Sequence, residues 1–525
     1  MKYFLTLIQL WVGFLSICAS YPKANIWIIP SVESPQVYRN YAQTSKVHLE
    51  MARGEVEHIQ LVFPSKVNEE YRFTFDRYLK GIQISARELK KMNGYYDALV
   101  PFKNQLKCTD TLTAVWITVQ CPSRVPVGKY HQTIKIEGSK HFTIQLDYNV
   151  HHTTIPLKSS IPITVGVENR CMTECLNDKE ADKERQRWVD FVLSYRMTPV
   201  FGTQITPERW QYEHSFSPWA WNDKRSIRLL NDRRYSCYML PFFTLSENEL
   251  ASLLCNIQKK GKLKESLFYI WDEPAYMEDY EQIKRKVNII RKYASDARIL
   301  TTFFCGPRNG PRKGDLYAVF DYLKHHIHVA TISLAPCKGN EEEVQHIRYK
   351  VPEGIDWWSY VCWQPGGNEP NFLLQMKGIQ QRAIMWRTWK NGSQGFLYWN
   401  CNIYHKRNPF TYITDMPHGD GILIYPGDIL GCKGPIASAR LERWRDGAEE
   451  MELLRLVEKN YSKEKNRQAD AAHLGKVCAL AAKHEVHGLV ALSDTGALGV
   501  GSKTVNPLAI AHDTSPFMHL RARPW

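Results

Sequence analysis

The stretch LFYIWDEP at residues 267–274 is an apolar run that ends in two adjacent carboxylates and a proline. Because no polar residue alternates within the run, it predicts a strand buried on both faces, as in a parallel sheet. Pro274 cannot donate to a β-ladder and therefore ends the strand. Asp272 and Glu273 would then lie at the carboxyl end of a buried strand, the edge at which parallel α/β folds place their chemistry.

An acidic pair is not by itself a sign of function. Acids make up 54 of the 525 residues, and other adjacent pairs, such as Glu69 and Glu70, occur in the chain. The alternative interpretation of Asp272 and Glu273 is a salt-bridged pair that helps to close the fold. The choice therefore depends on the pattern of the surrounding sequence.

The region around this strand alternates apolar runs with longer amphipathic segments, which is typical of a parallel sheet covered by helices. Eight strands are predicted, at residues 161–167, 199–201, 237–243, 267–271, 298–304, 328–333, 357–363 and 395–399. Helices are predicted between them at residues 179–195, 247–259, 277–293 and 372–389. Eight units in about 240 residues favour a (β/α)8 TIM-barrel-like catalytic domain, which we expect over residues 157–435.

The flanking regions follow other patterns, so the chain is predicted to be multidomain. Residues 21–156 carry short alternating or β-branched runs separated by turn residues, which predicts an N-terminal all-β sandwich. Residues 436–525 are expected to form a short C-terminal helical extension and tail. Within it, a charged amphipathic helix is predicted at 438–458 and a second helix at 470–483.

The first twenty residues predict a secretory signal peptide, because one positive charge precedes an apolar segment and a small-residue exit. We therefore expect an exported protein, periplasmic or extracellular. A rival interpretation makes Cys18 a lipid-attachment site, since residues 15–18 (LSIC) are close to a lipoprotein box. No later run approaches the roughly twenty apolar residues that span a bilayer, so no transmembrane segment is predicted.

The formal net charge of +14 is scattered along the chain and does not favour a nucleic-acid partner. An acidic glycan would suit this charge, although a solvated basic surface is the simpler interpretation. The 13 cysteines contain no zinc pattern, and no phosphate-binding loop or dinucleotide fingerprint is present, so no metal and no cofactor are expected. Cys108 and Cys121 are a candidate local disulfide, with buried free thiols as the alternative.

Adjacency of the two acids constrains their chemistry. Successive side chains of a strand point to opposite faces. Neighbours are therefore poorly placed to flank a glycosidic bond at the roughly 5.5 Å of a retaining pair or the 6.5–9.5 Å of an inverting pair. Adjacency suits substrate-assisted catalysis instead. There the 2-acetamido oxygen of the sugar attacks the anomeric carbon, one acid protonates the leaving oxygen, and its neighbour orients the acetamido group.

Five groups of segments carry a resemblance to a known family. They are YIWDEP at 269–274, DWWSYVCW at 356–363, GFLYW at 395–399, GDG at 419–421 with YPG at 425–427, and SARLE at 438–442 with RDG at 445–447. In these segments the chain resembles glycoside hydrolase family 123 and the related proteins that carry the domain of unknown function 4091. The sandwich expected before them agrees with the architecture of that family.

The resemblance implies an exo-acting glycosidase that removes terminal β-linked N-acetylgalactosamine from glycans or glycolipids by a retaining, substrate-assisted mechanism. Glu273 would be the general acid, and Asp272 would hold the acetamido group. We expect the pKa of Glu273 to be raised toward neutrality by a partly apolar, carboxylate-rich setting. The open alternatives are a glycosidase of the same fold that acts on a different sugar and a non-catalytic glycan-binding surface protein.

Aromatic residues at the ends of the last two predicted strands are the expected substrate-binding residues. They are Tyr360, Trp363, Tyr398 and Trp399, with core packing as the alternative for each. Trp363 departs from the family pattern, which has a smaller residue there, and residues 448–452 also differ from it. The segment 419–427 either shapes the rim of the site or turns the chain. Arg440, Glu442 and Arg445 are expected to anchor the C-terminal helix. The oligomeric state is left open.

Overall fold

The computed structural model describes residues 26–460, except for 77–80, 207–210, 335–346, 348–349, 367–368, 405–406 and 410–418. The signal peptide, the lipid-attachment cysteine and the helix predicted at 470–483 lie outside the described residues, so export stays a prediction. In the described part of the chain, every helix is too short or too polar to cross a membrane.

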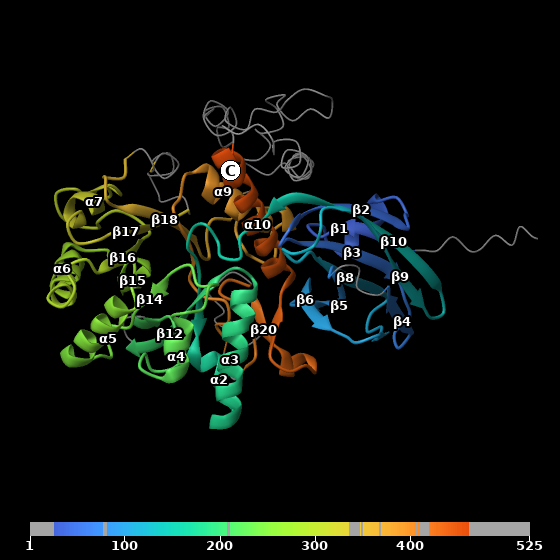
Figure 1. Ribbon diagram of the computed structural model, residues 1–525, viewed down its shortest axis with the longest axis horizontal. Coiled ribbons are helices and arrows are strands. Elements are labelled where there is room, and N and C mark those ends of the chain that lie inside the picture. Colours follow the sequence, from blue (N-terminus) through green and yellow to red (C-terminus); the bar gives the residue numbers. More distant parts are fainter. Residues whose placement is uncertain are drawn as a thin grey trace, which may run out of the picture.

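The first part of the fold consists of two five-stranded sheets, drawn in blue to teal in Figure 1. Their strands are β1 (Trp27–Pro30), β2 (Lys46–Arg53), β3 (Val56–Pro64), β4 (Glu70–Phe75), β5 (Gln83–Met92), β6 (Tyr95–Pro101), β7 (Gln105–Lys107), β8 (Leu112–Gln120), β9 (Gly128–Glu137) and β10 (His141–Thr154). One sheet has the order β1-β3-β8-β5-β6 and the other β2-β10-β9-β4-β7. Alternate residues of β10 are buried, as expected for a strand with one face on the core. Almost all of β3 is buried, which indicates that its sheet is covered on both faces.

The second part is a nine-stranded, mostly parallel sheet. Its strands are β11 (Ile163–Glu168), β12 (Thr198–Thr206), β13 (Gln211–Ser215), β14 (Tyr238–Met239), β15 (Ser266–Trp271), β16 (Arg298–Phe303), β17 (Val329–Ser333), β18 (Asp356–Val361) and β19 (Phe396–Tyr398). Their order is β13-β12-β11-β19-β18-β17-β16-β15-β14. Each of the eight predicted strands has a counterpart in this sheet, and the eight are paired in parallel.

The sheet differs from the predicted eight-stranded pattern at its two edges. β13 is an additional strand, antiparallel to β12, and its polar sequence QYEHS gave no apolar run to detect. β14 is only two residues long, because Pro241 cannot continue the ladder. The edges approach each other, since the N–H of Phe216 donates to the carbonyl of Met239 at 2.6 Å. The result is a nearly closed, barrel-like sheet with an apolar interior.

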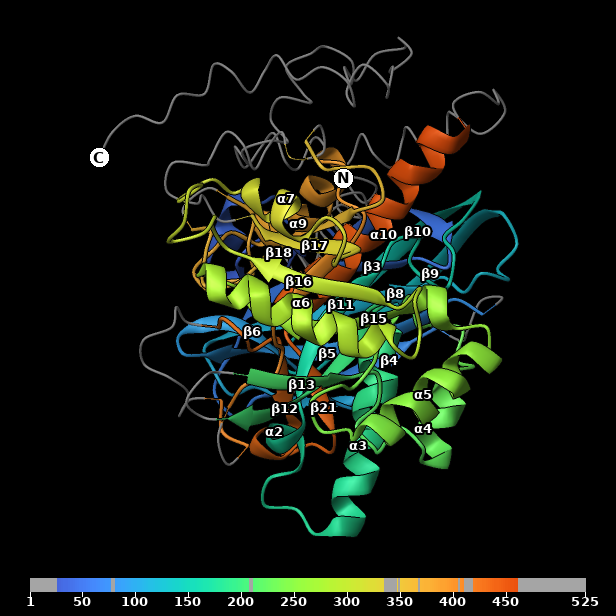
Figure 2. The same ribbon diagram turned by 90° about the vertical axis from the view of Figure 1, so that its left-hand side faces the viewer.

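Helices cover the outside of this sheet, as Figure 2 shows for α6 and α5. They are α2 (Asn169–Thr173), α3 (Asp178–Ser194), α4 (Lys224–Leu229), α5 (Glu247–Lys259), α6 (Met277–Arg291), α7 (Ala318–Leu323) and α9 (Gly378–Lys390). The predicted helix at 372–389 begins later, at Gly378, because the Gln380 side chain accepts the Lys377 N–H at 3.0 Å and caps the first turn. A small hairpin of β20 (Ile424–Pro426) and β21 (Pro435–Ala437) follows the sheet and leads into α10 (Ala439–Asn460).

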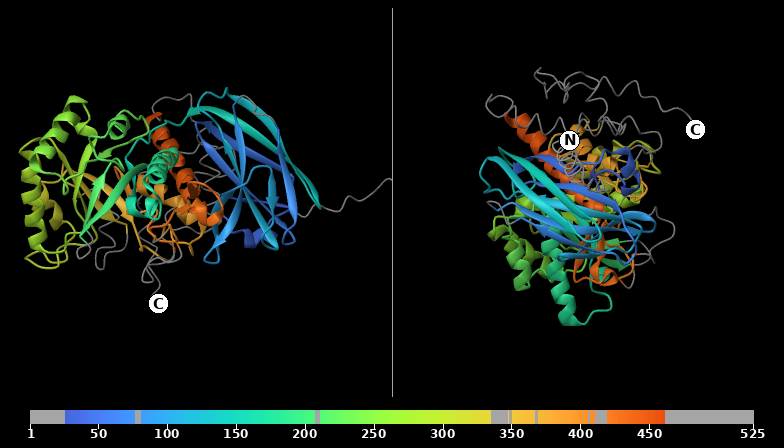
Figure 3. Two further views of the ribbon diagram at one scale, coloured as in Figure 1. Left: turned by 90° about the horizontal axis from the view of Figure 1, so that it is seen from below. Right: turned by 90° about the vertical axis from the view of Figure 1, so that its right-hand side faces the viewer.

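Helix α10 lies between the sandwich and the barrel-like sheet (Figures 1 and 3). The sequence predicts a charged amphipathic helix at 438–458, and the helix is present, but its charged residues do not form a separate face toward solvent. Every residue from 439 to 454 is buried, the charged ones included. The charges are accommodated because partners from both sides meet them: Glu442 contacts His58 of β3 at 3.1 Å and accepts from Tyr195 OH at 2.8 Å.

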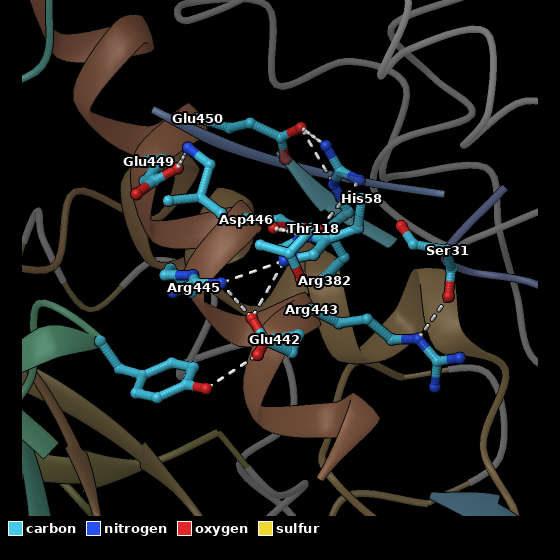
Figure 4. A network of polar contacts seen from close by, with 12 residues as sticks. Ser31, His58, Thr118, Arg382, Glu442, Arg443, Arg445, Asp446, Glu449 and Glu450 are labelled. Carbon is cyan, nitrogen blue, oxygen red and sulfur yellow. Dashed lines mark hydrogen bonds and ion pairs between the residues drawn. The ribbon is translucent and has the colours of Figure 1, made fainter. Parts of the chain in front are cut away.

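The ionic network around α10 joins this helix to β3 and α9 (Figure 4). Asp446 contacts His58 at 2.9 Å and Arg382 of α9 at 3.3 Å. Arg445 and Glu442, one turn apart on α10, form an ion pair. Because all of these side chains are nearly inaccessible to water, the network joins the two parts of the fold with paired charges rather than with apolar contact alone.

The disulfide predicted between Cys108 and Cys121 is not formed. Both residues are buried free thiols, next to the ends of β7 and β8. The alternative interpretation, in which dispersed cysteines act as small apolar core residues, is therefore the one that holds for this pair.

Candidate active site

A cavity of about 800 Å³ opens where the carboxyl ends of β11, β12, β15 and β19 meet. Asp272, Glu273, Tyr398 and Trp399 line it, so four of the six predicted site residues lie together. The remaining two differ from each other. Tyr360 of β18 reaches Glu273 through its hydroxyl group, whereas the side chain of Trp363 is 45% exposed and is not among the residues that line the cavity.

Both acids can face the cavity because strand β15 ends before Asp272, so the two residues do not have extended strand backbone. β15 stops at Trp271, and its pairing with β16 shifts register between Tyr269 and Trp271. Glu273 then adopts a φ of 46°, in the left-handed region that side chains other than glycine rarely occupy. The alternation of side chains along a strand therefore does not apply to Asp272 and Glu273. Such backbone strain costs of order 1–3 kcal/mol and is found most often at functional sites.

Glu273 has the properties of a proton donor. Its carboxylate accepts from the hydroxyl group of Tyr360, and its backbone N–H donates to Thr302 Oγ1 at 3.0 Å. The carboxyl group is accessible from the cavity, but the cavity walls remove most of its bulk solvent. Burial and, second, the charge of Asp272 raise its pKa to about 7, although Tyr360 and Arg308 oppose the shift. A large fraction of Glu273 is therefore protonated at neutral pH.

Two hydroxyl groups fix the position of the Asp272 carboxylate. Tyr269 OH and Thr302 Oγ1 each donate to its Oδ1 at 2.7 Å. Tyr269 is in turn fixed by His214, whose ring stacks on it at 4.2 Å between centroids. Burial lowers the pKa of His214 to about 3, so this histidine is neutral and adds no charge to the site. With Oδ1 occupied in this way, Oδ2 of Asp272 is the oxygen available to a ligand.

The aromatic wall of the cavity depends on a buried acid. Asp420 accepts from Trp399 Nε1 at 3.0 Å and from Tyr398 OH at 3.1 Å, both at Oδ1. Burial raises the pKa of Asp420 to about 6, against the effect of these two hydrogen bonds. The next residue, Gly421, has a φ of 69°, and a Cβ there would lie 2.5 Å from the Trp399 ring. Asp420 and Gly421 together therefore set the position of Trp399.

Sequence reasoning missed several of the supporting residues. Thr302 lies within a predicted strand and carries no signal that separates it from any other buried threonine. Tyr269 is three residues before Asp272, and two side chains at this spacing point to opposite faces of a regular strand, so a contact between them is not expected. Asp420 belongs to the GDG segment quoted above, where its buried position could not be inferred. Within the described ranges, no group of three His, Cys, Asp or Glu side chains could hold a metal ion.

Comparisons with known proteins agree with this geometry. Residues 183–457 match the family model described as glycoside hydrolase 123, catalytic domain. A family 123 glycoside hydrolase from Clostridium perfringens, whose structure was described together with the details of glycolipid glycan hydrolysis, superimposes with a TM-score of 0.61 and 14% identity. The alignment covers 85% of this chain and 91% of that chain. At this identity the likeness shows a shared fold.

Two further solved structures have low similarity. A GH2 β-galacturonidase from Eisenbergiella tayi has a TM-score of 0.31 at 8% identity, over 75% of this chain and 89% of that chain. A GH5 xyloglucanase from Bacteroides ovatus has a TM-score of 0.26 at 10% identity, over 77% and 98%. These scores are too low to support any inference. No curated protein matches the chain in sequence.

Proposed function

The chain belongs to glycoside hydrolase family 123 and is a glycosidase, and from this premise we propose that it removes terminal β-linked N-acetylgalactosamine from glycans or glycolipids. We propose a retaining mechanism in which the 2-acetamido group of the substrate is the nucleophile. The observation that carries this proposal is the unlike environment of two adjacent carboxyl groups. Glu273 has a pKa of about 7, whereas Asp272 is fixed by two hydroxyl donors.

The unlike environments suit the two steps of such a reaction. In the first step, the acetamido oxygen attacks the anomeric carbon, Glu273 donates its proton to the leaving glycosidic oxygen, and an oxazolinium ion forms on the sugar. Asp272 accepts the acetamido N–H through Oδ2 and stabilises the developing positive charge. In the second step, Glu273 removes a proton from the water that attacks the same carbon, and the acetamido group is restored. Two inversions at one carbon give net retention.

The supporting contacts favour these roles over the reverse assignment. An acid that must donate a proton at neutral pH needs a raised pKa, and Glu273 has one. A residue that orients an acetamido group needs a fixed position, which Tyr269 and Thr302 provide for Asp272. Trp399, held by Asp420, supplies a flat apolar wall of the kind that packs against a sugar ring. The ring of Tyr398 is instead fully buried against Phe372 and Trp444, so for this residue the core-packing alternative holds.

The first experiment compares nitrophenyl β-N-acetylgalactosaminide, β-N-acetylglucosaminide and β-galactoside as substrates of the purified chain. We expect hydrolysis of the first alone, with the β-anomer of the free sugar as the initial product by NMR. Hydrolysis of the β-galactoside, which has no acetamido group, would favour a glycosidase with a different sugar specificity. Binding without turnover of any substrate would favour a glycan-binding protein.

Two variants separate the roles of the acids. For Glu273→Gln, we expect a much larger loss on an alkyl glycoside than on the nitrophenyl glycoside, because nitrophenolate leaves without a proton. For Asp272→Asn, we expect similar losses on both, because acetamido participation is needed whatever the leaving group. If the ratio of the loss on the alkyl glycoside to the loss on the nitrophenyl glycoside were the same in both variants, the assignment of roles would be contradicted. General acid catalysis is worth about 10²–10⁴-fold, which sets the size of the expected effect.

A further inference from the structure

The cavity extends beyond the two acids toward helix α6. On that side its lining residues include Trp271, Phe243 from the loop after β14, and Gln282 and Lys286 of α6. Gln282 and Lys286 are four residues apart and therefore lie on one face of the helix. The mechanism proposed above uses none of these four side chains.

Lys286 differs from neighbouring lysines in its partners. Lys284 pairs with Glu281 at 2.7 Å, and Lys292 pairs with Glu247 at 2.8 Å. Among the residues that the structure describes, no ion pair includes Lys286. Its ammonium group lies instead 5.3 Å from the centroid of the Phe243 ring and 5.9 Å from the ring of Trp271.

Burial leaves the charge of Lys286 poorly compensated. The side chain is half-buried, and burial lowers the pKa of its ammonium group, with no carboxylate acting in the opposite direction. The two acids at the start of α6, Glu278 and Asp279, also line this side of the cavity but have other partners. Asp279 accepts from the backbone N–H groups of Ala275 and Tyr276 at 2.8 and 2.9 Å, and Glu278 accepts from Asn309 at 3.3 Å.

A simpler role for Lys286 would be to cover the two rings with its aliphatic stem. That role does not explain why Lys286, a residue that lines the cavity with the two acids, has no carboxylate partner while Lys284 has one. An anionic group of a ligand would supply the missing charge, and the flat ring of Trp271 would pack against the sugar that carries it.

We propose that Lys286, Gln282, Trp271 and Phe243 form a subsite for an anionic group, a carboxylate or a sulfate ester, carried by the sugar adjoining the one that is cleaved. The substrate class is then an acidic oligosaccharide or glycolipid headgroup with a terminal β-linked N-acetylgalactosamine. This subsite rests on the proposed function, because it assigns the neighbouring part of the same substrate.

The test uses the Glu273→Gln chain, so that ligands bind without being cleaved. Three oligosaccharides are titrated by calorimetry, all ending in β-linked N-acetylgalactosamine: one with a neutral second sugar, one with a carboxylate on that sugar (a sialyl branch), and one with a sulfate ester there. We expect at least one acidic ligand to bind about tenfold more tightly than the neutral one at low salt, with the advantage decreasing as salt screens it.

Variants at Lys286 locate the effect. The advantage of the acidic ligand should be lost in Lys286→Met and retained in Lys286→Arg, which keeps the charge. Lys284→Met removes the same charge from the same helix outside the cavity and should retain the advantage. Thermal unfolding of each variant controls for folding, and Lys286→Gln replaces Lys286→Met if the latter is unstable.

The outcomes separate the subsite from the proposed function. A preference for the carboxylate ligand alone, or for the sulfate ligand alone, supports the subsite and identifies the source of the anion. Equal binding of neutral and acidic ligands, or a preference that survives Lys286→Met, overturns the subsite and leaves the proposed function standing. Failure of all three ligands to bind overturns the proposed function and, with it, the subsite.

Discussion

Two pairs of acids in this molecule, Glu442 with Asp446 on α10 and Glu273 with Asp272 at the cavity, contain the same residue types in unlike surroundings. At α10, burial alone would raise the pKa of Glu442, but the charges of Arg445, Arg87 and His58 outweigh it and hold that pKa well below its usual range. At the cavity, burial and the charge of Asp272 raise the pKa of Glu273. A carboxylate surrounded by cations stays ionised and holds the fold, whereas one for which burial and a neighbouring carboxylate outweigh the effect of Arg308 can carry a proton.

The largest expected effect comes from replacing Glu273, because its carboxyl group is the proposed proton donor. In Glu273→Gln, kcat/KM for an alkyl β-N-acetylgalactosaminide should fall by about 10²–10⁴-fold. The free energy of unfolding should stay close to that of the unaltered chain, because no described cation forms an ion pair with Glu273. The measurement is steady-state kinetics beside urea unfolding. A large loss of stability would show that Glu273 belongs with the structural acids.

The matching change at α10 should have the reverse pattern. Glu442→Gln leaves Arg445, Arg87 and His58 buried with one negative charge fewer, and removal of one partner from a buried ionic cluster typically lowers the free energy of unfolding by about 3–5 kcal/mol. Urea unfolding measures this loss. Activity per folded molecule should be retained, and its selective loss with unchanged stability would contradict the comparison.

The stabilisation from the acids of the α10 network and that from its histidine should be lost on opposite changes of pH. The lowered pKa values of Glu442 and Asp446 give stability that is present above the ordinary carboxyl range, about pH 4, and is lost as pH falls through the lowered values. His58, whose pKa their charges raise against the effect of burial, gives stability that is present below about pH 6.5 and is lost as pH rises through its raised value. Unfolding of the unaltered chain and of Glu442→Gln across pH tests this. Equal pH dependence in the two chains would contradict the assignment.

Thr302 offers a smaller test at the cavity, because it accepts from the Glu273 backbone and donates to Asp272. Thr302→Val removes the hydroxyl group at nearly constant shape and should lower kcat by roughly 10- to 100-fold, since the loss of one hydrogen bond to a charged group is worth about 1.5–3 kcal/mol. Thr302→Ser should restore most of the rate. Full activity of Thr302→Val would show that Asp272 needs no such support.

The smallest effect is expected at Trp363, the predicted site residue that is not among those lining the cavity. Trp363→Ala should change kcat/KM less than Trp399→Ala does, because Trp363 is largely exposed whereas Trp399 lines the cavity and is held by Asp420. Kinetics on the nitrophenyl glycoside compares the two variants. A greater loss at Trp363 would place it at the sugar after all.

Most of the eight parallel strands were predictable because they are apolar runs buried on both faces. The acids at the end of β15 were predictable for the same reason, since their position follows from where the apolar run stops. β12 was predicted only over residues 199–201, because its continuation through Thr203 and Gln204 is polar and exposed. β13 was not predicted, because an edge strand with a polar sequence lacks that signal. The burial of α10 was hidden as well. Its charged residues indicate a solvated face unless partners such as His58 and Arg382, distant in sequence, are known to meet them.

The orientation of the two acids could not be predicted from strand periodicity. It depends on a register shift after Tyr269 and on the left-handed backbone of Glu273, and neither leaves a mark on the local sequence. The resemblance to family 123 supplied the roles of Asp272 and Glu273, but not the hydroxyl groups of Tyr269 and Thr302 that support them.

The most direct test of the central claim, that Glu273 is the proton donor, is the pH dependence of kcat/KM for an alkyl β-N-acetylgalactosaminide. The proposed mechanism predicts a decline as pH rises above about 7, where Glu273 loses its proton. It also predicts that this decline is absent from the residual activity of Glu273→Gln on the nitrophenyl glycoside. A decline that persists in Glu273→Gln, or a rate in the unaltered chain that stays constant through this range, would contradict it.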